Sequence, residues 1–157
     1  MELIWQQEAV KAHSVILADS YRRWTGRELL ARVVDREEWG KRLFEAPFVV
    51  VSHGTEADPV LNYGNAAALA LWELSWDELI RTPSRLTAEA PERAERAKLL
   101  AAVAARGFID NYEGIRISRR GRRFRITRAT VWNLVTPEGA SLGQAAIFSD
   151  WAYLRDN

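Results

Sequence analysis

Arginine is the chemistry-bearing residue type that this chain concentrates most strongly. A guanidinium group can bind a phosphate or a carboxylate through two parallel hydrogen bonds, and a basic segment can bind nucleic acid. The arginine run contains only one aromatic residue, Phe124, whereas proteins that bind single strands stack bases on several. Charge on a hairpin edge also prevents strand pairing between molecules. We therefore interpret the run as a solvent-exposed hairpin and do not expect nucleic-acid binding. Its members are Arg116, Arg119, Arg120, Arg122, Arg123, Arg125 and Arg128.

Residue types that support catalysis or metal binding are sparse. The chain has no cysteine, which excludes disulfides, thiolate nucleophiles, zinc–thiolate sites and a covalent cysteine–flavin adduct. His13 lies on an apolar helical stripe, where a buried and hydrogen-bonded histidine is expected, and His53 follows a predicted strand as a surface loop residue. The carboxylates of Asp110, Glu113 and Asp150 have no base or oxyanion donor beside them in the pattern. We predict no catalytic residues, no metal site and no enzyme.

Aromatic and polar side chains on the last two predicted strands, completed by Trp72 and Tyr112, are predicted to form a candidate ligand pocket. Residues two apart share one face of a strand, so Thr130 and Trp132 should face Gln144 and Phe148 on the next strand. A lining of aromatic side chains with few polar groups is typical of small-molecule pockets. The alternative is an ordinary packed core, and the pattern leaves both open. The candidate pocket residues are Trp72, Tyr112, Thr130, Trp132, Gln144 and Phe148.

The first third of the chain is predicted to be helical. Leu3, Val10, Leu17 and Trp24 follow one another seven residues apart, which makes one apolar stripe on a helix. A second helix is predicted over residues 36–44, and Pro47 enforces its end. We interpret residues 1–46 as an N-terminal helical cap or dimerisation extension, with the apolar stripe as the predicted homodimer surface.

Residues 47–157 are predicted to form one α+β domain. Strands are expected over 48–52 and 60–63, followed by short helices capped by Asn65 and Ser75. A longer helix over 91–106 begins at Pro91 and ends at Gly107. Three antiparallel strands follow over 112–118, 122–135 and 142–154, with Gly121 in the first connecting turn.

Composition supports a single soluble domain. The 157 residues carry 22 Lys and Arg against 21 Asp and Glu, so the net charge of +1 provides no global attraction to nucleic acid or a membrane surface. The N-terminus is amphipathic rather than continuously apolar, unlike a signal peptide. No segment approaches the length of a membrane span. We therefore expect a cytoplasmic protein without membrane association.

The order of these elements resembles the PAS fold, and several segments resemble the PAS-like MEKHLA family. The matching segments are SVILADSYRRWTGRELL (14–30), TPSRLTAE (82–89), GFIDNYEGIRI (107–117), GRRFRITRATVWNL (121–134) and GQAAIFSDW (143–151). The resemblance implies a five-stranded antiparallel sheet with helices packed on one face and an N-terminal helical extension. In plants such domains end homeodomain–leucine-zipper regulators and are thought to sense a signal or regulate dimerisation. No catalytic residues and no established ligand accompany the family.

The same resemblance constrains the cofactor. Flavin-binding PAS proteins place a glutamine of the last strand against the flavin ring, a position to which Gln144 is loosely similar. Their reactive cysteine is absent, so a covalent flavin adduct is excluded and non-covalent flavin is not expected. Haem-binding relatives commonly use a histidine on the long helix, and residues 91–106 contain none, so haem is not expected. The cofactor is unknown.

Three functions follow from these observations. The first is a stand-alone sensory or regulatory module that binds a small hydrophobic or aromatic ligand and shifts the docking of the N-terminal helices. The second is a protein–protein interaction module with a filled core. The third, a small acid–base enzyme, requires a buried titratable group that the sequence does not reveal.

Overall fold

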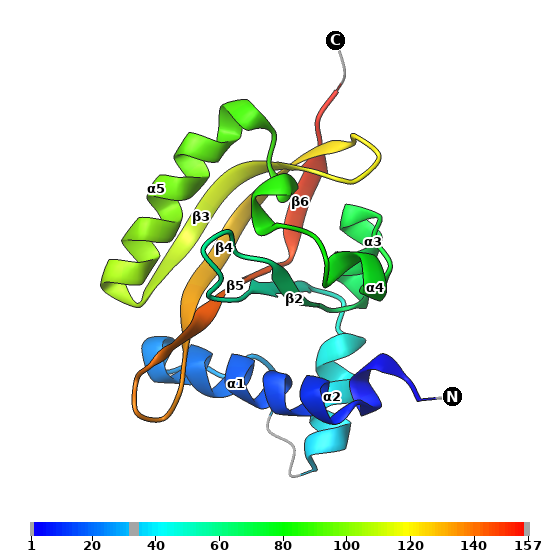
Figure 1. The fold of residues 1–157 in the computed structure, drawn as a ribbon, viewed down its shortest axis with the longest axis vertical. Coiled ribbons are helices and arrows are strands. Elements are labelled where there is room, and N and C mark those ends of the chain that lie inside the picture. The colour runs from blue at the N-terminus through cyan, green and yellow to red at the C-terminus, as the bar shows by residue number, and fades with distance from the viewer. Residues whose placement is uncertain (1, 32–34, 156–157) are drawn as a thin grey trace.

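An antiparallel sheet with helices on both faces forms the protein (Figure 1). The computed structural model describes residues 2–31 and 35–155. Within these residues the strand order is β2-β1-β5-β4-β3, and β6 pairs with a second part of β4. The strands are β1 (Val49–His53), β2 (Leu61–Gly64), β3 (Phe108–Ile117), β4 (Arg123–Val135), β5 (Ser141–Phe148) and β6 (Asp150–Tyr153).

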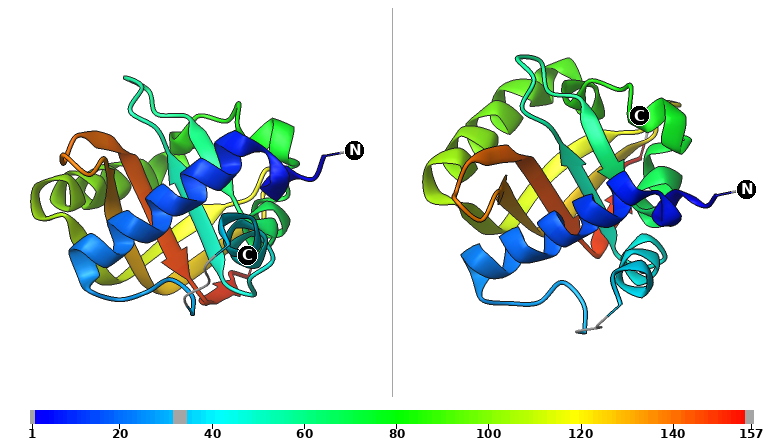
Figure 2. Two further views of the ribbon diagram at one scale, coloured as in Figure 1. Left: turned by 90° about the horizontal axis from the view of Figure 1, so that it is seen from below. Right: turned by 60° about the horizontal axis from the view of Figure 1, so that its bottom comes forward.

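The helices divide between the two faces of the sheet. Figure 2 shows α1 lying across one face, with α5 on the other side of the sheet. The predicted helix over 36–44 is confirmed as α2, and the long helix begins one residue before the predicted Pro91. The helical elements are η1 (Ile4–Gln6), α1 (Glu8–Thr25), α2 (Arg36–Phe44), α3 (Ala66–Trp72), α4 (Trp76–Leu79), η2 (Ser84–Thr87) and α5 (Ala90–Arg106).

The predicted α+β class with an antiparallel sheet is confirmed, with one difference at the C-terminus. The single last strand expected over 142–154 is interrupted at Ser149, so that it forms β5 and β6. Both pieces pair with β4, which is long enough at 13 residues to accommodate them end to end. The sheet therefore has six strands rather than five.

Two compensating bulges lie in the β3–β4 pair. On β4, one extra residue lies between Ile126 and Ala129, where Arg128 adopts a left-handed backbone with φ of 55°. On β3, Asn111 also adopts a left-handed backbone, with φ of 56°, and adds one extra residue to that strand. The two extra residues offset each other, so the pairing register of β3 and β4 is the same on both sides of the bulges. An extra residue in a strand moves all later side chains to the opposite face. Even-numbered residues of β4 therefore face one side before Arg128 and the other side after it.

The face covered by α1 forms one of two apolar cores. Leu17 and Val10 are buried against Trp132 and Leu134 of β4, and Tyr21 packs edge-on to Trp132 with ring centroids 5.0 Å apart. The apolar stripe predicted on this helix is thus largely covered by the sheet of the same chain. A homodimer through this stripe would require α1 to leave the sheet, and the homodimer stays a prediction, as does the division of the chain at residue 46.

Candidate ligand-binding site

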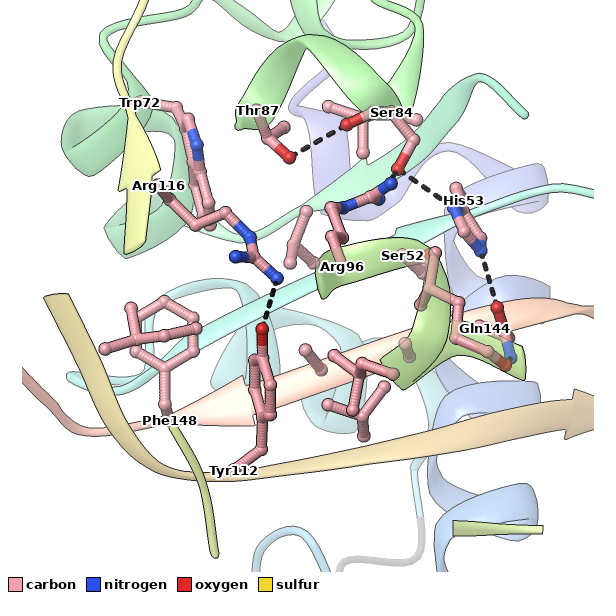
Figure 3. Close-up of a pocket in the computed structure, with 18 residues that line it drawn as sticks. Ser52, His53, Trp72, Ser84, Thr87, Arg96, Tyr112, Arg116, Gln144 and Phe148 are labelled. Carbon is pink, nitrogen blue, oxygen red and sulfur yellow. Dashed lines mark hydrogen bonds between the residues drawn. The ribbon is translucent and has the colours of Figure 1, made fainter. Parts of the chain in front are cut away.

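The opposite face of the sheet carries a cavity beneath α5 and η2, with a water-accessible volume of about 60 Å³ (Figure 3). Strands β1, β3, β4 and β5 form its floor, so segments distant in sequence meet there. Its apolar walls include Leu61, Trp72, Leu99, Ile126, Val131 and Phe148. Its polar residues include His53, Ser84, Thr87, Arg96, Arg116 and Gln144.

Four of the six predicted pocket residues line this cavity, namely Trp72, Tyr112, Gln144 and Phe148. Thr130 and Trp132 do not, because the bulge at Arg128 turns them to the face covered by α1. There the Thr130 hydroxyl donates to Asp110 at 2.7 Å, and Trp132 packs against Tyr21. The β4 residue at the corresponding place in the cavity is Val131. Ligand binding by any of these residues stays a prediction.

A directional chain of hydrogen bonds crosses the cavity from α5 to β5. Arg96 donates to the Ser84 hydroxyl, which lies 2.9 Å from Nδ1 of His53. Nε2 of His53 lies 3.2 Å from Oε1 of Gln144, an atom that can only accept, so the imidazole is the Nε2–H tautomer and Ser84 donates to Nδ1. Gln144 in turn donates to the Leu100 carbonyl on α5 at 3.0 Å. These hydrogen bonds therefore join η2, β1, β5 and α5 around the cavity.

Two polar side chains of β3, those of Tyr112 and Arg116, also line the cavity. Arg116 donates to the Tyr112 hydroxyl at 3.1 Å, and its guanidinium lies 5.6 Å from the centre of that ring. Gly114 separates the two residues on the strand, and a Cβ atom there would lie 2.8 Å from Cζ of Tyr112 and 3.0 Å from Nη1 of Arg116. Absence of a side chain at Gly114 is what lets both side chains fold over the strand toward each other.

Burial and mutual repulsion of like charges shape the electrostatics of the cavity. Desolvation lowers the pKa of Arg96 to about 10, and the charge of Arg116 contributes to the same direction. Desolvation, followed by the charge of Arg96, also lowers the pKa of His53, which keeps the imidazole neutral at pH 7. Guanidinium groups keep their positive charge at that pH, so the cavity carries positive charge inside a largely apolar wall.

Of these six polar residues the sequence predicted only Gln144, and His53, Ser84, Thr87, Arg96 and Arg116 were missed. His53, expected in a surface loop, is the last residue of β1 and only 6% exposed. Arg96 lies on the same helical face as Leu99, Leu100 and Val103, at a spacing of three, four and seven residues, which is a signal the sequence contained. Arg116 shares the alternation of Tyr112 on β3, and its assignment to the solvent edge is wrong.

The other hairpin arginines agree with the predicted exposed edge. Arg119 pairs with Glu78, and Arg125 pairs with Glu113 at 3.0 Å. Arg122 lies over the ring of Tyr153 on β6, 3.7 Å from its centre. Neighbouring acidic and aromatic groups thus partner much of this charge on the surface, which distinguishes these residues from Arg116.

His13 lies on the face covered by α1, as a partly buried and hydrogen-bonded histidine. Its Nε2 lies 2.9 Å from the hydroxyl of Ser52, which itself donates to Asn62 at 2.6 Å. The His13 ring stacks on Tyr63 with centroids 5.7 Å apart. The prediction of a buried, hydrogen-bonded histidine on the stripe fits this environment. No cluster of three or more His, Asp or Glu side chains that could hold a metal occurs in residues 2–31 and 35–155.

We expect the protein to lose stability as the pH falls from about 6.5 toward 4. Burial lowers the pKa of His13 to about 4, whereas the unfolded chain titrates near 6.5. Between these values the unfolded state binds more protons, so the free energy of unfolding rises with pH through this window and the contribution is complete above it. The difference corresponds to about 3 kcal/mol. Urea unfolding at a series of pH values measures it.

The control for this pH dependence is His13→Gln, which keeps a donor toward Ser52 and does not titrate. Its stability should vary less with pH than that of the wild type, and a residual slope from His53 and the carboxylates should remain. An unchanged slope in this variant would contradict the assignment to His13.

Comparison with known proteins identifies the family. A family model described as the MEKHLA domain matches residues 11–153. The chain belongs to the MEKHLA domain family. The matched region includes most of α1 and all of α2, so the family's own pattern extends over the N-terminal helices. No curated protein matched the chain.

Solved structures similar to this MEKHLA domain have the PAS fold. A PAS domain from Colwellia psychrerythraea gives a TM-score of 0.62 at 13% identity, covering 75% of this chain and 95% of that one. A light-oxygen-voltage domain studied with a flavin analogue gives 0.58 at 15% identity, covering 76% and 86%. The PAS domain of a LuxR-family transcriptional regulator from Burkholderia thailandensis, in complex with ethanol, gives 0.54 at 17% identity, covering 73% and 96%. The predicted PAS-like fold is confirmed.

A flavin does not fit the residues present. A water-sized atom requires roughly 10–15 Å³ of such volume, so the 60 Å³ cavity accommodates about four to six atoms rather than three fused rings. The chain also lacks the cysteine that a covalent adduct would need. Among the described residues, no helix is both long enough and apolar enough to span a bilayer.

Proposed function

We propose that this MEKHLA domain is a sensory or regulatory module that binds a small molecule in the cavity between α5 and the sheet. The observation that carries the proposal is a set of charged and polar side chains around an apolar cavity inside the domain. Buried polar groups are costly unless they are partnered, so their concentration here favours a ligand over an ordinary core. The ethanol described in the LuxR-family PAS domain supports a ligand of this small size.

Ligand occupancy would act through α5 and η2. Arg96 and Ser84 belong to these two helical elements, and their hydrogen bond closes one side of the cavity. A ligand shifts an equilibrium only by its differential affinity for two states. A ligand that changes the contacts of Arg96 would therefore change how α5 docks on β3 and β4. Signalling to a partner, including a second copy of the chain through the N-terminal helices, would follow from that displacement.

Native mass spectrometry of protein purified without denaturation tests the proposal. We expect a bound small molecule on the wild type that disappears in Ala146→Phe, because Ala146 lines the cavity and a larger side chain fills it. Circular dichroism controls for folding, since overpacking costs roughly 1–3 kcal/mol. An empty wild-type protein that no small molecule stabilises would instead support an interaction module with a filled core.

A further inference from the structure

Two arginines face the cavity without a carboxylate to neutralise them. Arg116 is only 6% exposed, and it donates hydrogen bonds to the neutral Ile115 carbonyl at 2.8 Å and to the Tyr112 hydroxyl at 3.1 Å. Arg96 donates to the neutral Ser84 hydroxyl. Within residues 2–31 and 35–155, neither guanidinium forms an ion pair with a carboxylate. Burying a charge is costly unless it is paired. The two guanidinium groups therefore favour the binding of an anion beside them.

The carboxylate of Glu95 does not supply that anion. Glu95 accepts a hydrogen bond from the Tyr112 hydroxyl at 2.9 Å, and so lies one hydroxyl group away from Arg116. Glu95 is solvent-exposed on α5 and is not among the residues that line the cavity. His53 is neutral or cationic in its two protonation states, so it cannot neutralise Arg96. The cavity side of both guanidinium groups is therefore open to a ligand (Figure 3).

Cavity size and lining restrict the anion. At roughly 10–15 Å³ per water-sized atom, the 60 Å³ volume holds about four to six non-hydrogen atoms. Leu99, Val131 and Phe148 offer no partner to a fully polar oxyanion such as phosphate, but they suit a short alkyl group. Trp72 also lines the cavity, and its buried Nε1–H has no acceptor among the described residues.

We infer that the cavity binds a short-chain monocarboxylate of about four to six non-hydrogen atoms, with its carboxylate held between Arg96 and Arg116. This inference rests on the proposed function and names the chemistry of the ligand. Guanidinium groups match carboxylates in geometry as well as charge. Gly114 contributes by leaving the space in which the Arg116 side chain lies over Tyr112.

Isothermal titration calorimetry of the full chain tests the inference with three probes. Sodium butyrate is the anion, 1-butanol is its neutral counterpart of similar size, and inorganic phosphate is the fully polar anion. We expect butyrate to bind the wild type at least tenfold more tightly than either of the others. Hydrogen bonds to charged groups are worth about 1.5–3 kcal/mol, equivalent to roughly 10–100-fold in affinity.

Matched arginine variants locate the binding. Arg116→Met and Arg96→Met each remove one cavity guanidinium while keeping a long apolar side chain, and each should weaken butyrate binding at least tenfold. Arg125→Met is the control, because Arg125 lies on the exposed face of β4 and pairs with Glu113. It should leave butyrate affinity unchanged. Circular dichroism of every variant confirms folding, and the comparison of the three probes on the wild type needs no variant.

The outcomes separate this inference from the proposed function. Equal binding of butanol and butyrate, or butyrate binding that survives both cavity variants, overturns the anion site and leaves a ligand-binding module. Tight phosphate binding without butyrate binding overturns the carboxylate assignment. If none of the probes binds and the purified protein carries no small molecule in native mass spectrometry, both proposals fail.

Discussion

Replacing Asn65 by alanine lowers the free energy of unfolding by about 3–5 kcal/mol. Asn65 is fully buried and its side chain makes four hydrogen bonds. Its Oδ1 accepts from the amides of Val50 and Ala68, and its Nδ2 donates to the carbonyls of Leu43 and Phe48. The side chain therefore caps α3 and also joins the end of α2 to β1. Alanine leaves all four backbone groups without this partner in the interior.

Ser75→Ala is the matched control for Asn65→Ala. Ser75 caps α4 in the same manner, accepting from the Glu78 amide at 3.1 Å, but at an exposed position. Its loss should cost about 1 kcal/mol, the usual value for a helix cap. Asn65→Asp keeps the acceptor and replaces the two donors with charge facing carbonyls, so we expect it to be as damaging as alanine. Urea unfolding followed by tryptophan fluorescence measures all three, and equal losses for Asn65→Ala and Ser75→Ala would contradict the account.

Replacing Leu17 by alanine lowers the free energy of unfolding by about 2–5 kcal/mol, because it leaves a cavity between α1 and the sheet. Leu17 is 0% exposed in the core that contains Trp132. Leu3 belongs to the same predicted stripe but is 50% exposed. Leu3→Ala should therefore change stability by no more than about 0.5 kcal/mol. The pair compares one residue type at two positions that the helical spacing alone treats as equivalent.

The Leu17 and Leu3 variants also bear on the predicted homodimer. If the stripe packs on its own sheet, Leu17→Ala lowers stability at every protein concentration, as urea unfolding at two concentrations would show. If the stripe instead pairs two chains, sedimentation velocity would reveal that Leu17→Ala dissociates a dimer without unfolding the monomer. The second result would contradict the docking of α1 on the sheet.

Local signals placed most elements where the structure has them. Asn65 and Ser75 were predicted as caps from residue type and position, and both caps are present. Pro91 and Gly107 marked the two ends of the long helix to within one residue. These features depend on neighbours a few residues away, so residue order is sufficient to specify them.

The candidate site depends on which distant segments meet and on whether side chains alternate without interruption along β4. Trp72, Tyr112, Gln144 and Phe148 were predicted to share a pocket and do line one cavity. Thr130 and Trp132 were placed with them because strand alternation was assumed to run unbroken through β4. The left-handed backbone at Arg128 interrupts that alternation. An asparagine such as Asn111 is enriched in that conformation, but an arginine carries no such signal.

The arginines at positions 116–128 illustrate the same division. Residue types and spacing indicated the α+β fold, the element order and an Arg-rich hairpin, and the resemblance of several segments indicated the family. Only the tertiary structure decided that Arg116 turns into the cavity that Arg96 lines from α5, while its neighbours pair on the surface. The physical reason is that burial depends on which distant segments pack together and on how a bulge rotates a strand. Residue order specifies charge and periodicity, whereas the packing of α5 and η2 over the sheet makes two of those charges the walls of a cavity.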